Sequence, residues 1–162
     1  MKNAILILSL LLLLAQAFPA YGQQAENLVG AWHTGTPAMM KRPDQTTAAD
    51  RSDREKLLTY VFLPDGHYDF TGYMDSMVGS CKTIIFNSIK GKYTVEGSTI
   101  KLDPVSDSWN NSNSCAPAGD KKENKTPVKR SLEFKLKEDK DGGQLLCLAD
   151  GGTETCYEKV KK

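Results

Sequence analysis

The chain has 162 residues, of which 40% are hydrophobic, and its 21 basic side chains nearly balance its 20 acidic ones. This length is that of one ordinary globular domain with a single core. The charge balance argues against a strongly basic face and therefore against nucleic acid or an anionic membrane surface as the partner.

The first 22 residues have the pattern of a secretory signal peptide. Lys2 gives a short basic start, residues 4–15 are apolar except for Ser9, and small residues follow up to Gly22. Such a run is shorter than the ~20 apolar residues that span a bilayer. We expect cleavage after residue 22, export to the periplasm or the outside medium, and one domain over residues 23–162 without a membrane anchor. An uncleaved anchor is the alternative.

The mature part reads as short strands separated by turn residues. The first strand is expected at 27–34. Residues 35–56 then form a long polar connection that contains Met39 and Met40. Long connections of this kind are candidate binding loops.

A hairpin follows, with strands at 57–63 and 67–74 joined by Pro64-Asp65-Gly66. Proline suits the first position of such a turn and glycine its left-handed position. This turn places Phe62 opposite Tyr68, which gathers the aromatic side chains on one face and the polar ones on the other.

Three further strands are expected at 81–86, 90–95 and 98–102, the last two around a two-residue turn, Glu96-Gly97. Pairing about this turn leaves one face apolar, as in a half-buried ladder. That face consists of Tyr93, Val95, Ile100 and Leu102. Residues 103–129 are rich in Asn, Ser, Lys and Pro and are interpreted as a second long surface loop.

The chain ends with a strand at 131–136 and a hairpin of 145–149 and 154–159 around Gly151-Gly152. Counting outward from this turn, Cys147 faces Cys156 at a non-hydrogen-bonded pair, where the Cα atoms are close enough for a disulfide.

The remaining cysteines, Cys81 and Cys115, then pair by elimination. Two disulfides are expected because export favours oxidised thiols. A zinc site with His33 or His67 is the alternative, but the cysteines lack paired C-x-x-C spacing. No metal and no cofactor are predicted.

About eight short strands with one apolar face each predict an all-β, closed, antiparallel up-and-down barrel, because closure removes exposed edges. Leu28-Val29-Gly30-Ala31-Trp32 resembles the G-x-W signature of lipocalin-like (calycin-type) barrels. Tyr60-x-Phe62-x-x-Asp65-Gly66-x-Tyr68 and Gly91-x-Tyr93-x-Val95-x-Gly97 look like small secreted bacterial members of that group. The resemblance implies that the tryptophan closes one barrel end and that the first long loop lies across the other. A β-sandwich is the alternative fold.

The candidate ligand-binding residues are the inward aromatic side chains and two methionines of the first loop. They are Tyr60, Phe62, Tyr68, Phe70, Tyr93, Phe134, Met39 and Met40. Buried tyrosine hydroxyls need partners, which favours a pocket with a few polar groups. The alternative is a solid core, because an eight-stranded barrel is just wide enough for its own side chains.

No catalytic residue is assigned, because the sequence holds no nucleophile elbow, H-E-x-x-H pair or phosphate-binding glycine loop. The leading hypothesis is an exported, monomeric, non-catalytic protein that binds a small hydrophobic ligand inside its barrel. The alternative is a protein-interaction or inhibitor module that contacts a protein partner through residues 35–56 and 103–129 over a solid core.

Overall fold

The computed structural model describes residues 26–35 and 54–161. Residues 26–28 form a helical turn. The strands are β1 (Gly30–Gly35), β2 (Arg54–Phe62), β3 (His67–Val78), β4 (Cys81–Glu96), β5 (Thr99–Asn113), β6 (Lys121–Asn124), β7 (Arg130–Glu138), β8 (Gln144–Asp150) and β9 (Thr153–Lys159), with a short 3-10 helix, η4 (Pro117–Gly119), before β6. The predicted all-β class is confirmed. Within these two ranges no helix is long and apolar enough to cross a membrane.

The sheet closes on itself because β4 pairs with both β3 and β5. Eight strands form the ring in the order β1-β2-β3-β4-β5-β7-β8-β9, and each neighbouring pair is antiparallel. Two seams of the ring are short: β5 meets β7 over Thr99–Leu102, and β1 meets β9 only at Trp32 and His33. The closed up-and-down barrel predicted from the sequence is confirmed, and the β-sandwich alternative is not what forms.

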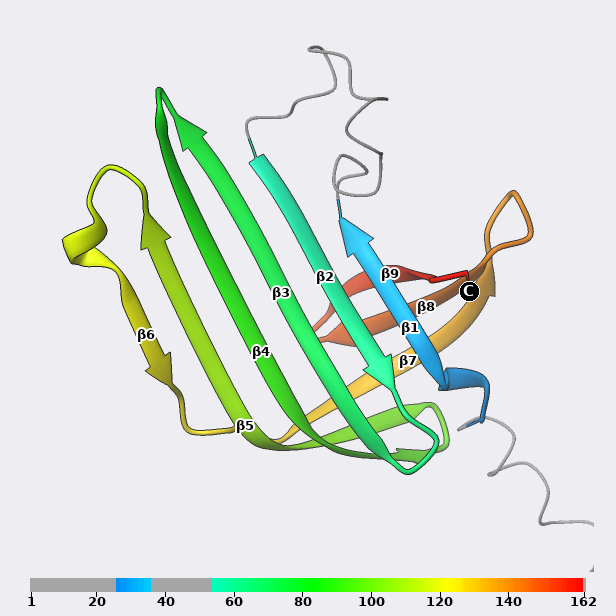
Figure 1. The fold of residues 1–162 in the computed structure, drawn as a ribbon. Helices are drawn as coiled ribbons and strands as arrows, with labels where there is room; N and C mark the ends of the chain where they lie inside the picture. Colours follow the sequence, from blue (N-terminus) through cyan, green and yellow to red (C-terminus); the bar gives the residue numbers. More distant parts are fainter. Residues whose placement is uncertain (1–25, 36–53, 162) are drawn as a thin grey trace, which may run out of the picture.

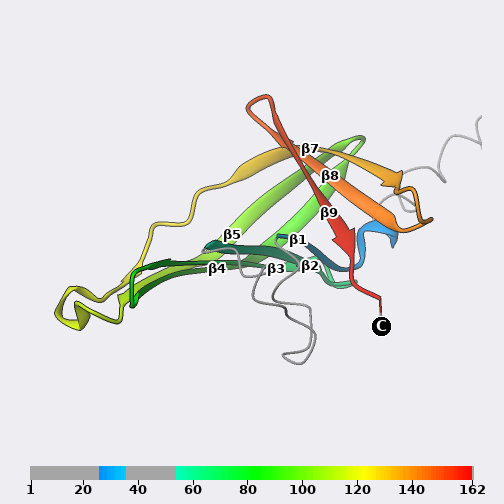
Figure 2. The same ribbon diagram turned by 90° about the horizontal axis from the view of Figure 1, so that it is seen from above.

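Part of the sheet extends beyond the barrel, and we call it the wing: residues 73–78 of β3, 81–86 of β4, 108–113 of β5, and β6. β5 leaves β7 after Leu102 and pairs with β6 over Ser108–Asn111. Figure 1 shows the β3–β4 hairpin and β6 projecting away from β7–β9, and Figure 2 shows the same separation from above.

The prediction of a surface loop over residues 103–129 was wrong, because β5 continues to Asn113 and β6 follows at Lys121–Asn124. The predicted strands at 81–86 and 90–95 are likewise one strand, β4. Except for the buried Asp75, side chains on both faces of the wing keep contact with water. Its strands therefore do not need the apolar alternation by which a half-buried strand is recognised.

The register of the β2–β3 hairpin is confirmed: Phe62 lies opposite Tyr68. In the β4–β5 hairpin the turn is Gly97-Ser98 instead of the predicted Glu96-Gly97, and Gly97 takes the left-handed conformation with φ of 56°. Tyr93 therefore pairs with Leu102. The shift is two residues, and since side chains alternate with a period of two, the predicted apolar face is preserved.

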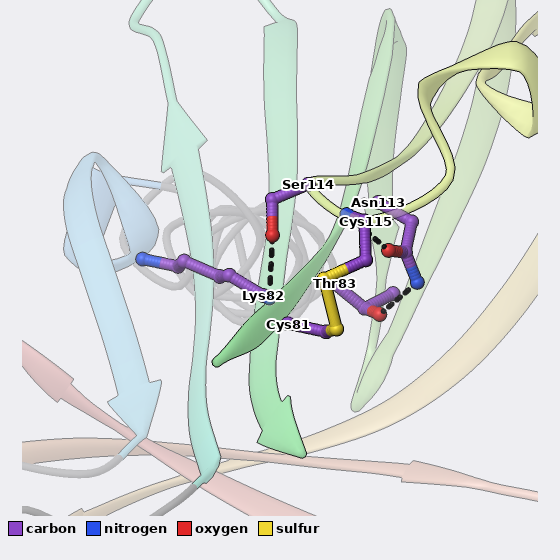
Figure 3. The surroundings of a disulfide bond; sticks show 6 residues. All are labelled: Cys81, Lys82, Thr83, Asn113, Ser114 and Cys115. Carbon is purple, nitrogen blue, oxygen red and sulfur yellow. Dashed lines mark hydrogen bonds between the residues drawn. A yellow bond between two sulfur atoms is a disulfide. The ribbon is translucent and has the colours of Figure 1, made fainter. Parts of the chain in front are cut away.

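Both predicted disulfides form, with Cα–Cα distances of 3.9 Å for Cys147–Cys156 and 5.3 Å for Cys81–Cys115. The second joins the start of β4 to the segment just after β5 (Figure 3). Beside it the Lys82 amide donates to Ser114 Oγ at 2.8 Å, and the Ser114 amide donates to the Lys82 carbonyl at 2.9 Å. Such cross-links are typical of an oxidising, extracellular-type environment.

One end of the barrel is filled by side chains, and we call it the closed end. Trp32 is 0% exposed, and its Nε1–H donates to the carbonyl of Leu28 in the helical turn at 2.7 Å. Lys159 Nζ lies 5.0 Å above the Trp32 ring. Phe62 packs edge-on against Tyr93, whose hydroxyl donates to the Leu63 carbonyl at 3.0 Å. The tryptophan therefore closes this end, as the resemblance implied.

Candidate functional site

The opposite end of the barrel is open, and two adjoining cavities share Tyr60 and Arg130 as lining residues. Cavity A, about 270 Å³, lies against β3, β4 and β5. Its walls are Tyr60, Tyr68, Phe70, Asn87, Ile89, Leu102, Pro104, Asp107, Val128 and Arg130. Cavity B, about 240 Å³, lies against β7, β8 and β9. Its walls are Tyr60, Arg130, Leu132, Leu148, Asp150, Thr153, Thr155 and Tyr157.

The aromatic wall of cavity A follows directly from strand periodicity. Tyr68 and Phe70 are two residues apart on β3, and Tyr60 lies opposite Phe70 on β2. Alternate residues of a strand point to the same side, so all three rings face inward. The Tyr60 and Phe70 ring centroids are 4.7 Å apart. A continuous aromatic surface therefore lines the bottom of the open end.

The open end is hollow because its inward positions carry small or polar side chains. Gly72, Asn87 and Asp107 occupy the inner face of β3, β4 and β5 beyond the aromatic wall. Gly72 pairs with Asn87, and Ile89 pairs with Asp107. The corresponding positions at the closed end hold large, fully buried groups such as Trp32 and Phe62. The difference in side-chain volume leaves space at one end only.

Several polar atoms around cavity A lack partners within residues 26–35 and 54–161. Asn87 Oδ1 and Asp107 Oδ1 are enclosed and accept no hydrogen bond. Of the tyrosines facing the barrel interior in these ranges, Tyr93 is the one whose hydroxyl is hydrogen-bonded. Unpaired buried polar groups cost free energy, so native proteins pair nearly all of them. Of the four enclosed atoms without a partner in the described ranges, Asn87 Oδ1 and Asp107 Oδ1 belong to residues of cavity A, whereas His33 Nδ1 and Asn111 Oδ1 do not. A ligand in cavity A can supply partners for the first two.

Arg130 stands between the two cavities and forms an ion pair with Asp150 from the β8–β9 hairpin. Burial by itself would lower the pKa of Arg130, but the hydrogen bond to Asp150 and the nearby Tyr60 more than offset it, so the pKa is raised. Arg130 is therefore a permanent cation at the mouth of the barrel, and its charge is balanced by Asp150.

The tyrosines of the open end are held in their neutral form. Burial raises the pKa of Tyr68 to about 12. Burial also raises the pKa of Tyr60 and of Tyr157, whose rings meet edge to face with centroids 5.4 Å apart. At neutral pH their hydroxyls can therefore donate or accept a hydrogen bond from a bound molecule.

The stability of the protein is expected to fall as pH rises from 10 towards 12, and Tyr68→Phe should make that fall shallower. Unfolded tyrosine loses its proton near pH 10, whereas folded Tyr68 keeps it up to about pH 12. The unfolded state then binds fewer protons, which lowers the free energy of unfolding. Urea unfolding of the wild type and of Tyr68→Phe at several pH values above 9 gives the difference between their free energies of unfolding. The lysines are the same in both proteins, so the effect of their deprotonation cancels in this difference. Parallel pH profiles would show that Tyr68 is not protected.

The structure brings three of the predicted ligand-binding residues together at cavity A: Tyr60, Tyr68 and Phe70. It places Phe62, Tyr93 and Phe134 in the main hydrophobic cluster, and none of these three lines cavity A or cavity B. Tyr93 also borders a surface groove of about 380 Å³ between β4, β5 and β7. Met39 and Met40 lie outside the described residues.

The polar residues of the open end were missed by sequence reasoning. Asn87 lies between the predicted strands 81–86 and 90–95, Asp107 lies in the predicted loop 103–129, and Arg130 lies between that loop and the predicted strand 131–136. A signal existed, because Asn87 and Asp107 have the same parity as the inward-facing Ile89 and Leu102, once the bulge between Lys90 and Gly91 is counted. This pattern identifies Asn87 and Asp107 as inward-facing only if β4 and β5 are first recognised as continuous strands.

Two other features, a hollow outside the barrel and a group of possible metal ligands, are weaker candidates for a functional site. A hollow of about 430 Å³ lies outside the barrel and is lined by Asp139 and by residues 141–144 and 158–161. Within the described part of the chain, Cys147, Cys156 and Glu154 are the residues grouped closely enough to hold a metal ion. The two sulfur atoms are joined in a disulfide and so are not thiolate ligands.

Comparisons of this chain with protein-family models, with curated proteins and with solved structures found no match. Function is therefore inferred from the geometry of the open end alone.

Proposed function

We propose that this protein is an exported, lipocalin-like barrel that binds a small, largely apolar molecule at its open end without catalysing a reaction. The observation that supports this most directly is cavity A, in which Tyr60, Tyr68 and Phe70 form an aromatic wall below a few unpaired polar atoms. Small-molecule sites typically combine a concave apolar lining with a small number of polar groups.

The size of the site limits its ligand. Cavity A measures about 270 Å³ and adjoins cavity B of about 240 Å³. Pockets for drug-sized molecules begin near ~300 Å³, so cavity A suits one ring or a short chain, and a longer molecule would pass Arg130 into cavity B. Each Å² of apolar ligand surface removed from water contributes ~25 cal/mol to binding. Export is part of the proposal and is supported by the signal-like start and the two disulfides.

The direct test is native mass spectrometry of the mature protein purified from its own host, followed by denaturing extraction. A small apolar molecule at high occupancy supports the proposal and identifies the ligand class. The same spectrum reads the mature mass, which checks cleavage after Gly22.

A blocking substitution tests the cavity itself: Ile89→Trp should weaken binding of the neutral fluorescent probe N-phenyl-1-naphthylamine at least tenfold. Ile89 is half-buried and lines cavity A, so a larger ring occupies the space that the probe needs. Lys90→Trp is the matched control, because the next residue on β4 is exposed and points out of the barrel. Equal affinities for both variants and the wild type would remove cavity A as the binding site.

A protein-interaction module is the second candidate, and the wing favours it. Several large apolar side chains of the wing are exposed, namely Met74, Met77, Val78 and Phe86. Met74 and Val78 lie on one face of the β3–β4 hairpin, and Met77 and Phe86 lie on the other. Exposed apolar side chains mark interaction surfaces where they form one patch. A second protein seen in the native mass spectrum, with no small molecule bound, would support this candidate over the first.

A further inference from the structure

The two cavities differ in how their acidic side chains are paired. Beside cavity B, the Asp150 carboxylate is paired with Arg130. Beside cavity A, Asp107 makes no ion pair with any residue of the described ranges, and its Oδ1 is enclosed without a hydrogen bond. Cavity A therefore contains an anionic group with no cation assigned to it.

A second acceptor stands next to Asp107. Asn87 pairs with Trp109, and Ile89 pairs with Asp107, so Asn87 and Asp107 are diagonal neighbours on the inner face of β4 and β5. Diagonal neighbours lie within reach of one polar group placed between them. Because Asn87 Oδ1 also has no partner, this wall of the cavity presents two acceptors and requires a donor.

The charges around the cavity favour a cationic donor. Arg130 is balanced by Asp150, which leaves Asp107 as the excess charge. An anionic ligand would face Asp107 at close range, which costs binding free energy.

The aromatic wall adds attraction for a cation. The rings of Tyr60, Tyr68 and Phe70 line the same cavity as Asp107. A cation within ~6 Å of a ring centroid is attracted by the negative face of the ring, and the attraction grows when water is excluded. The carboxylate and the rings therefore favour the same kind of group.

We propose that cavity A binds a ligand that carries a protonated amine, whose N–H groups donate to the Asp107 carboxylate and the Asn87 amide oxygen while its apolar body lies on the three rings. This rests on the proposed function, since it requires the cavity to admit a small molecule. The terminal torsions of Asp and Asn are soft, so each side chain can turn an oxygen towards the space it lines.

Three probes of matched shape test the proposal: 2-phenylethylamine, 2-phenylethanol and 3-phenylpropionate, titrated into the mature protein at neutral pH and low salt and followed by NMR shifts. The amine should bind about tenfold more tightly than the alcohol, and the carboxylate should bind most weakly. An amine no tighter than the alcohol, or a carboxylate tighter than both, overturns the proposal while leaving the cavity as an apolar site. Failure of all three, together with failure of the neutral fluorescent probe, overturns the proposed function as well.

Asp107→Asn assigns the effect to the carboxylate. This change preserves the shape of the side chain and removes its charge. The affinity for the amine should therefore fall to within about twofold of the affinity for the alcohol, and the affinity for the alcohol should not change. Asp103→Asn is the matched control, because it removes the same charge from the same strand at an exposed carboxylate paired with Lys129 at 2.7 Å. If both variants lower amine affinity equally, the preference is a general effect of net charge and the assignment to Asp107 is wrong.

Discussion

Trp32→Ala is expected to lower the free energy of unfolding by about 3–5 kcal/mol, the usual cost of truncating a large buried aromatic side chain. Trp32 is 0% exposed and fills the closed end of the barrel. The change removes this packing and leaves a cavity that the surrounding strands cannot close, because they are held by the sheet on both sides. Urea unfolding followed by circular dichroism measures the loss.

Two further variants separate packing from hydrogen bonding. Trp32→Phe keeps most of the ring but leaves the Leu28 carbonyl, now 2.7 Å from Nε1, without its donor, and it should cost about 1–3 kcal/mol. Trp109→Ala is the control, because this second tryptophan is half-buried on the wing under Lys125; it should cost less than about 2 kcal/mol. Equal losses for Trp32→Ala and Trp109→Ala would mean that the closed end does not dominate stability.

Replacing Cys81 and Cys115 together by Ala should lower the free energy of unfolding by about 4 kcal/mol, because the bond restrains the unfolded chain over a separation of 34 residues. The folded wing should persist. The hydrogen bonds between Lys82 and Ser114 link the same two strands, and Asn113 Nδ2 donates to Thr83 Oγ1 at 3.0 Å (Figure 3). Chemical denaturation gives the stability, and hydrogen exchange at the Lys82 and Ser114 amides gives the state of the wing.

The control is Ser114→Ala, which removes one hydrogen bond and keeps the disulfide, at an expected cost of about 1 kcal/mol. An unchanged free energy of unfolding in the double cysteine variant, with the wing amides exchanging freely, would contradict the prediction. It would mean that the wing opens independently of the barrel, so that the bond constrains a local unit alone.

The local chemistry of turns made much of the fold predictable. Pro64-Asp65-Gly66 set the register of β2 and β3, and Gly151-Gly152 placed Cys147 opposite Cys156, as found. The β4–β5 turn was displaced by one residue, because Glu96, Gly97 and Ser98 all suit a tight turn and the flanking alternation is the same for both registers. Period-two alternation therefore identified the inward faces even where the exact partners were wrong.

The wing and the polar half of the site were not predictable in the same way. Residues 106–113 have the composition of a loop, and they form a strand because β4 offers its edge along their whole length. Asn87, Asp107 and Arg130 come from three strands and meet only because the sheet curls into a barrel. No spacing in the chain encodes that meeting, since it depends on closure of the sheet.

By itself, the sequence determined the all-β class, the aromatic inner face and the disulfide pairing, because each of these depends on residues near a turn or on alternation along one strand. Only the tertiary structure decided which end of the barrel is filled and which is open. That outcome depends on the total volume of the inward side chains that different strands contribute at each end of the barrel. Large side chains meet around Trp32 at one end, whereas the other end has Gly72, Asn87 and Asp107.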